Sequence, residues 1–189
     1  FLKNSDEEID AKQAKSLALA IRDWISPYDL SHGKDSYMSY YLSQNPPYYP
    51  SHQLMKSPSE LRLIQGIDTK KYLNLLRYIS VLPETTAVNI NTASPAVLAS
   101  LGDGISKEQV EQLLEAKGSA AKDLNKLNPI LQSMNIPNGQ VSVLSTYFLS
   151  VTYASNQDDD LIVYRLIKRA IDNGGNVSVS MLQESINTY

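Results

Sequence analysis

Two stretches decide how the middle of this sequence folds: SPSELRLIQGIDTKKYLNLL at 57–76 and SPAVLASLGDGISKEQVEQLL at 94–114. They align as an internal repeat, and each indicates a short helix, a glycine–hydrophobic turn and a second, capped helix. Such a unit is a helix–hairpin–helix, and two copies can bury each other's apolar faces. The matched positions are Leu61 with Leu98, Ile64 with Leu101, Gly66-Ile67 with Gly104-Ile105, Asp68 with Ser106, Tyr72 with Val110, and Leu75-Leu76 with Leu113-Leu114.

Helix start signals recur throughout residues 57–135. Ser57-Pro58-Ser59-Glu60 has the form of a capping box with proline at the first helical position, and Ser94-Pro95 repeats this start. A second box begins at Ser106. These signals predict a helical domain of short helices over 57–135.

The N-terminal part predicts one amphipathic helix over residues 6–25. Its first turn is acidic, which the helix dipole favours, and Leu17, Ile21 and Trp24 recur at spacings of three and four. Pro27 ends the helix because the residue before a proline is disfavoured in helical conformation. Residues 27–57 then predict an irregular segment, in which tyrosine rings cover the core.

The C-terminal part, 141–189, changes to the alternating pattern of half-buried strands. Val141 to Tyr153 and Val177 to Met181 alternate clearly, whereas 161–170 is compatible with a strand or a helix. Asn173-Gly174-Gly175-Asn176 is a strong turn signal. Three such strands form an antiparallel meander that can pack one face on the N-terminal helix, so the predicted fold class is α+β.

Composition excludes several function classes. The chain has 189 residues, a formal net charge of −3 and no cysteine. Thiolate zinc sites, iron–sulfur clusters and cysteine nucleophiles are therefore absent, and a general nucleic-acid binder would carry an excess of lysine and arginine. No apolar run has the length of a membrane span. The chain opens with Phe1-Leu2, so we expect it to be trimmed and a preceding segment to have carried a signal or an anchor.

Catalytic and metal-binding patterns are sparse. The histidines, His32 and His52, lie in the irregular segment without a nucleophile-elbow motif, so we predict no catalytic residues, although a hydrolase using either one is an alternative. Asp29 and Asp35 lie in a short, oxygen-rich segment of the kind that hard cations prefer. They are the candidate ligands for calcium, the one cofactor expected; solvated aspartates are the alternative.

The repeat also raises DNA binding as an alternative function. In DNA-binding versions the turn reads glycine–hydrophobic–glycine, and its backbone amides contact a phosphate. Here the second glycine is replaced by Asp68 in one copy and by Ser106 in the other, and few basic residues lie nearby. A structural role for both hairpins is therefore favoured.

Several motifs in this order resemble the minor pseudopilin K family of the type II secretion system, over essentially the whole chain. The specific ones are Ser59-Glu60-Leu61-Arg62 followed by Gly66, and Asn89-Ile90-Asn91-Thr92-Ala93-Ser94. They are accompanied by Ala20-Ile21-Arg22-Asp23-Trp24-Ile25, Pro46-Pro47-Tyr48, Leu82-Pro83-Glu84-Thr85-Thr86 and Tyr147-Phe148-Leu149.

The resemblance implies a pilin-like body, formed by 1–56 and 136–189, in which the N-terminal helix packs on the antiparallel sheet. Residues 57–135 would be an inserted helical domain containing the two helix–hairpin–helix-like repeats. The family implies a Gram-negative inner-membrane protein, held by a preceding apolar helix, with its globular part in the periplasm. It would cap the pseudopilus tip together with minor pseudopilins I and J, without binding nucleic acid, and support pseudopilus assembly and protein export.

The resemblance also bears on individual residues. The family tends to hold calcium after the first helix, where this chain has Ser26 at the first aspartate position of the motif, Asp29 near the second and Gly33-Lys34-Asp35 near its later part. The apolar stripe Leu17, Ile21 and Trp24 is predicted to contribute both to the contact with the sheet and to partner docking.

Overall fold

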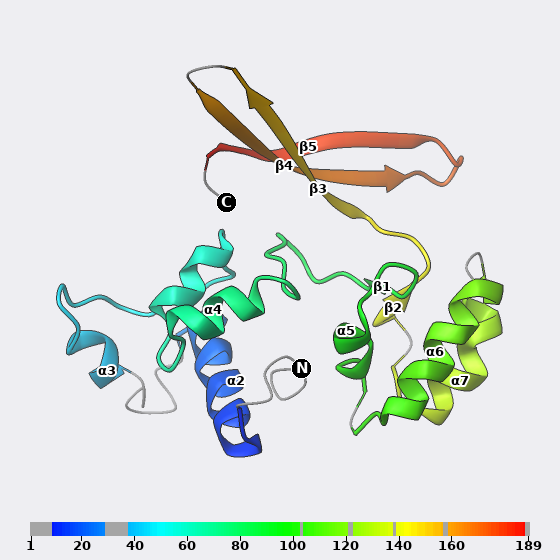
Figure 1. The fold of residues 1–189 in the computed structure, drawn as a ribbon, viewed down its shortest axis with the longest axis horizontal. Coiled ribbons are helices and arrows are strands. Elements are labelled where there is room, and N and C mark those ends of the chain that lie inside the picture. The colour runs from blue at the N-terminus through cyan, green and yellow to red at the C-terminus, as the bar shows by residue number, and fades with distance from the viewer. Residues whose placement is uncertain are drawn as a thin grey trace. The chain divides into compact units, whose positions relative to one another are not determined.

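The computed structural model describes residues 9–28, 38–102, 104–120, 123–137, 139–156 and 159–187. The chain divides into two compact units, Phe1–Thr85 and Thr86–Tyr189, which are described separately (Figure 1). The predicted arrangement, with a body of 1–56 and 136–189 around an insert of 57–135 and a helix packed on the sheet, concerns contacts between these units and stays a prediction.

The first unit is organised around helix α2, Ala11–Ile25. This helix begins later than the predicted residue 6, because Asp10 has extended backbone and its carboxylate accepts a hydrogen bond from the Gln13 amide (2.8 Å). Ser26, the residue before Pro27, has extended backbone and ends the helix where the sequence predicted.

One side of α2 is buried in the core of the first unit. The short helix α3, Met38–Leu42, adds Tyr41, whose side chain is 0% exposed and meets the Trp24 ring edge-on at 5.6 Å between centroids. Tyr48 also packs against this core, which agrees with the prediction that tyrosine rings cover it. The buried residues are Ile9, Leu17, Ala20, Trp24, Tyr41, Leu61, Ile64, Ile67 and Leu75.

The first repeat copy belongs to this unit. Its first helix, η2 at Pro58–Leu63, is a 3₁₀ helix and carries the predicted capping box between Ser57 and Glu60. The second helix, α4, spans Thr69–Leu75 and is capped by Asp68. Between them Gly66 has a φ of +86°, and a Cβ there would lie 2.9 Å from a Leu17 methyl carbon. Only glycine fits this turn comfortably.

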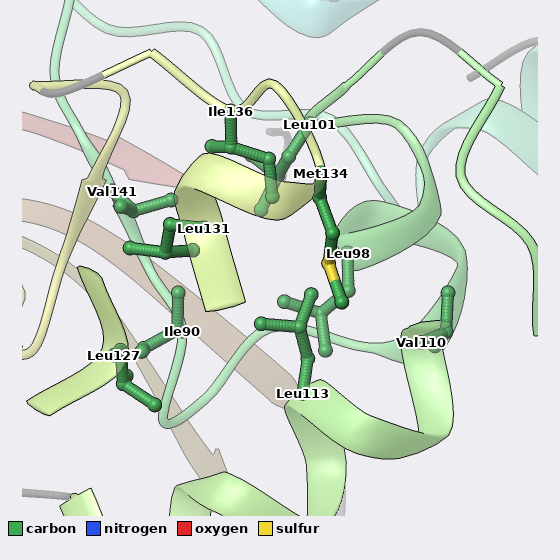
Figure 2. Packing of buried hydrophobic residues seen from close by; sticks show 10 residues of the cluster. All are labelled: Ile90, Leu98, Leu101, Val110, Leu113, Leu127, Leu131, Met134, Ile136 and Val141. Atoms are coloured by element: carbon green, nitrogen blue, oxygen red, sulfur yellow. The ribbon is translucent and has the colours of Figure 1, made fainter. Parts of the chain in front are cut away.

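The second unit has its own helical core, shown in Figure 2. Its helices are α5 (Pro95–Ala99), α6 (Lys107–Ala120), η3 (Leu124–Leu127) and α7 (Asn128–Ser133). Strand β1, Val88–Asn89, pairs in parallel with β2, Val141–Ser142, beside these helices. The buried residues are Ile90, Leu98, Leu101, Val110, Leu113, Leu127, Leu131, Met134, Ile136 and Val141.

The two repeat copies share their local geometry but not a core. In both, a glycine with positive φ (Gly66 at +86° and Gly104 at +72°) precedes the second helix. The buried apolar residues of the first copy belong to the core of the first unit, and those of the second copy belong to the core of the second unit. The expectation that the copies bury each other concerns contacts between the units and stays a prediction. The helix–hairpin–helix interpretation itself stays a prediction.

The C-terminal strands form the predicted antiparallel meander, in the order β3–β4–β5. Their bounds are Tyr147–Ser155, Asp160–Ile171 and Val177–Ile186, with a register shift between Leu166 and Ile167. The segment 161–170, which the sequence left open between strand and helix, is the central strand. The chain is therefore α+β.

Candidate partner-docking surfaces

An apolar groove runs beside α2 in the first unit. Its volume is about 500 Å³, and α2, the Leu54-Met55 segment, η2, α4 and the Ile79–Leu82 segment all line it. The lining is apolar apart from Arg22 and Ser80. The groove can therefore accept aliphatic side chains, and its walls provide few groups for directional hydrogen bonding. Apolar lining residues include Ala18, Ile21, Ile25, Met55, Ile79 and Leu82.

Of the three residues in the predicted docking stripe, two are buried in the core and one lines this groove. Leu17 and Trp24 are 5% and 3% exposed and belong to the core, whereas Ile21 is half-buried and lines the groove. Among these stripe residues, Ile21 is the one that the first unit leaves accessible to a second surface. The docking role of the stripe itself stays a prediction.

Hydrogen bonds to Glu60 connect α2 and η2, two of the elements that line the groove. The Trp24 indole donates to Oε2 of Glu60 (3.2 Å), and Oε1 of the same carboxylate accepts from the amides of Lys56 (2.7 Å) and Ser57 (3.4 Å). One carboxylate thus joins α2 to the start of η2. Such a charge-assisted arrangement fixes both elements more firmly than neutral hydrogen bonds would.

A second apolar surface is the sheet of the second unit. Opposed residues in the register point to one face, so Phe148, Ile167 and Met181 share a face while Leu149 and Leu166 share the other. Many of the large side chains stay exposed, with Val179 at 67% and Tyr153 at 73%, whereas Leu166 is 8% exposed. Exposure on this scale is typical of a surface that a further protein segment covers.

The signature Asn89-Ile90-Asn91 has a structural role that the sequence did not reveal. Ile90 is 1% exposed in the core, and the asparagines on both sides of it bind the segment that leads into β3. Asn89 Nδ2 donates to Ser145 Oγ (2.8 Å), and Asn91 Nδ2 donates to the Val143 carbonyl (3.0 Å). This motif therefore fastens β1 and the helical core to the start of the meander.

The other candidate residues give no assembled chemical site in the described part of the chain. Asp29, Asp35 and His32 lie outside the described residues. His52 lies with Nδ1 3.1 Å from the Ser26 carbonyl and with its ring against Tyr28. Within the described ranges, no group of three or more histidine, aspartate or glutamate side chains is placed to hold a metal ion.

Side chains already cap the start of the helix that follows each of the two glycine turns. Asp68 accepts from the Lys71 ammonium group (2.7 Å) and from the Lys71 amide (2.8 Å), and these bonds, the first above all, lower the pKa of Asp68. In the second copy Ser106 Oγ accepts from the Gln109 amide (3.3 Å). One backbone amide at the start of the helix after each turn is thus already capped, and Asp68 adds a negative charge that would repel a phosphate, which favours a structural role for both hairpins.

Two family models, both described as type II secretion system (T2SS), protein K, match consecutive segments of this chain. One family model covers residues 5–84 and a second covers 88–147. The type II secretion system protein K of Klebsiella pneumoniae is 35% identical over 114 residues, which cover 57% of this chain and 34% of that protein. The Pseudomonas aeruginosa protein K is 28% identical over 156 residues, covering 80% of this chain and 46% of that protein.

A solved structure has the same fold. A chain in the crystal structure of the GspK–GspI–GspJ complex from the enterotoxigenic Escherichia coli type 2 secretion system superposes with a TM-score of 0.70. It is 22% identical, and the match covers 100% of this chain and 68% of that one. The chain spans less than half the length of the two curated relatives described above.

Proposed function

Because this chain belongs to the type II secretion system protein K family, we propose that it is the globular part of a minor pseudopilin that assembles with minor pseudopilins I and J. The observation that carries the proposal is the pair of family matches, which follow one another over residues 5–84 and 88–147. The likeness to a chain of a solved complex whose name includes GspI and GspJ supports the same assembly.

The exposed apolar surfaces support an assembly role. A protein that works alone rarely leaves large contiguous apolar patches in water, because covering them releases about 25 cal/mol for each Å². The first unit leaves the groove beside α2 uncovered, and the second unit leaves many large apolar side chains of its sheet uncovered. We propose that the groove, through Ile21, receives a side chain of the I–J pair.

We further propose that the protein ends the pseudopilus rather than extending it. The helices α5, α6, η3 and α7 pack around the hydrophobic core of the second unit and add bulk to it. Such bulk on a pilin scaffold would occupy the space of the next subunit, so the filament would stop at this molecule. This position at the tip fits a role in starting assembly and supporting protein export.

The proposed location is the Gram-negative inner membrane, with this globular part in the periplasm. The family assignment supports it. Among the residues that the structure describes, no helix combines the length and apolar character that crossing a bilayer requires.

The docking role of the groove predicts the effect of Ile21→Glu. A carboxylate at this position would be desolvated against apolar walls, so retention of the variant by an immobilised I–J pair should fall about tenfold. Ser16→Glu is the matched control, because Ser16 is an exposed residue of the same helix that does not line the groove. Equal retention of both variants would show that the groove is not part of the interface, and the family assignment would still hold.

Calcium binding at Asp29 and Asp35 is proposed from the sequence alone. A ligand that binds only the folded state at 100 times its Kd adds about 2.7 kcal/mol of stability, which for this chain length raises Tm by about 5–10 °C. We therefore expect calcium to raise Tm and chelator to reverse the rise, in a thermal melt with magnesium as the control ion. The Tm of the variant with Asp29→Asn and Asp35→Asn should not change with calcium. If calcium left the Tm of the wild-type protein unchanged, the proposed site would be refuted.

A further inference from the structure

The tip of the β4–β5 hairpin contains an asparagine–glycine pair that is open to solvent. The sequence there is Asp172-Asn173-Gly174-Gly175-Asn176, and all five residues are exposed. The Gly175 amide donates to the Asp172 carbonyl (2.9 Å), and the Asp172 amide donates to the Asn176 carbonyl (3.0 Å). Gly175 has a φ of +81°, which turns the chain back into β5.

The carboxylate of Asp172 holds this turn together. Oδ1 accepts from the amides of Gly174 (2.8 Å) and Asn176 (2.8 Å), and Oδ2 accepts from the Asn176 side chain (2.9 Å). The bond from the Asn176 side chain, followed by the backbone bonds, lowers the pKa of Asp172. The carboxylate is therefore ionised at neutral pH, next to the backbone nitrogen of Gly174.

Asparagine followed by glycine can react with its own backbone. The nitrogen of the next residue, after losing its proton, attacks the side-chain carbonyl carbon; a C–N bond forms, the bond to the side-chain nitrogen breaks, and that nitrogen takes up protons and leaves as ammonia. Water then opens the cyclic imide at one carbonyl or the other, giving aspartate or isoaspartate. Glycine permits the attack because it has no side chain to obstruct it.

We propose that Asn173 is a spontaneous deamidation site whose reaction Asp172 suppresses in the folded hairpin. The attacking nitrogen of Gly174 is the donor of the 2.8 Å hydrogen bond to Asp172, so this bond must break before the nitrogen can reach the Asn173 side chain. The nearby carboxylate also disfavours loss of the amide proton, because that step creates a second negative charge beside it.

Conversion of Asn173 to isoaspartate would alter the end of the sheet next to the turn. Isoaspartate routes the main chain through the side-chain carbon and lengthens the backbone by one methylene between residues 173 and 174. The bond from Gly175 to Asp172 and the register from Ile171–Val177 onward depend on the present length of the turn. The modification would therefore loosen the end of the hairpin that carries the exposed apolar residues Val177 and Val179.

The test follows deamidation at Asn173 by peptide mapping with mass spectrometry, and isoaspartate by enzymatic methylation, in the full 189-residue chain. Asp172→Ala should deamidate about tenfold faster than wild type in the folded protein, as expected for loss of a hydrogen bond to a charged acceptor. Asn176→Ala is the matched control: it removes a side-chain contact of the same turn but keeps the Gly174 bond, so Asn173 should stay slow.

Two comparisons separate this local effect from general unfolding. The pair Asn138-Gly139 has the same chemistry elsewhere in the chain, and its rate should not change in Asp172→Ala. In concentrated urea, wild type and Asp172→Ala should react at Asn173 at similar, fast rates. The proposal is overturned if folded wild type deamidates as fast as the unfolded chain, or if Asp172→Ala leaves the folded rate unchanged.

Discussion

Replacing Trp24 by alanine is expected to destabilise the first unit by about 3–5 kcal/mol, the range for removing a buried aromatic side chain. The ring is 3% exposed, meets Tyr41 and Tyr48 edge-on, and donates to Glu60. Its removal leaves a cavity and takes away one hydrogen-bond donor of the Glu60 carboxylate. Because whole domains are stable by only about 5–15 kcal/mol, the first unit should unfold at a much lower urea concentration.

The comparison variant Trp24→Phe keeps most of the ring packing and loses the indole N–H. It should cost distinctly less than Trp24→Ala, and the remaining loss combines the bond to Glu60 with the packing of the larger indole ring. Both variants can be followed by far-UV circular dichroism during urea unfolding. If Trp24→Ala unfolded at the wild-type urea concentration, the core assigned to α2, α3 and η2 would be wrong.

Replacing Leu98 by alanine should destabilise the second unit by about 3–5 kcal/mol and leave the first unit intact. Leu98 is 0% exposed at the centre of the helical core shown in Figure 2. The only tryptophan, Trp24, lies in the other core, so its emission reports on the first unit alone. We therefore expect the circular dichroism transition to move to lower urea while the emission transition keeps its position.

Leu144→Ala is the matched control for this experiment. It deletes the same atoms in the same unit at a side chain that is 56% exposed, so its effect should stay within about 0.5 kcal/mol. An emission transition that shifted together with the circular dichroism signal in Leu98→Ala would show that the two cores unfold as one.

The sequence predicted those elements whose pattern extends over several residues. The spacing of Leu17, Ile21 and Trp24 identified the apolar face of α2, and alternation identified β3 and β5 but left β4 open between strand and helix. Periodicity shows that a face is apolar but not what covers it. For that reason the stripe could not be divided into core residues and the groove residue Ile21 before the fold was known.

Elements defined by single contacts were not predictable in this way. The strands β1 and β2 are two residues long each, too short to show a period, and their pairing joins residues 88 and 141. The division of the chain at Thr85 likewise depends on long-range packing, because Leu61 and Ile64 belong to the core around Trp24. The start of α2 was misplaced because the cap at Asp10 outweighs the favourable charges of the preceding acidic residues.

The most direct test of the proposed function is sedimentation velocity of this chain mixed with minor pseudopilins I and J. The proposal predicts one faster boundary that contains all three proteins in equal amounts, at concentrations where this chain alone sediments as a smaller species. If this chain kept its own boundary at every ratio of the three proteins, assembly with I and J through this part of the molecule would be contradicted.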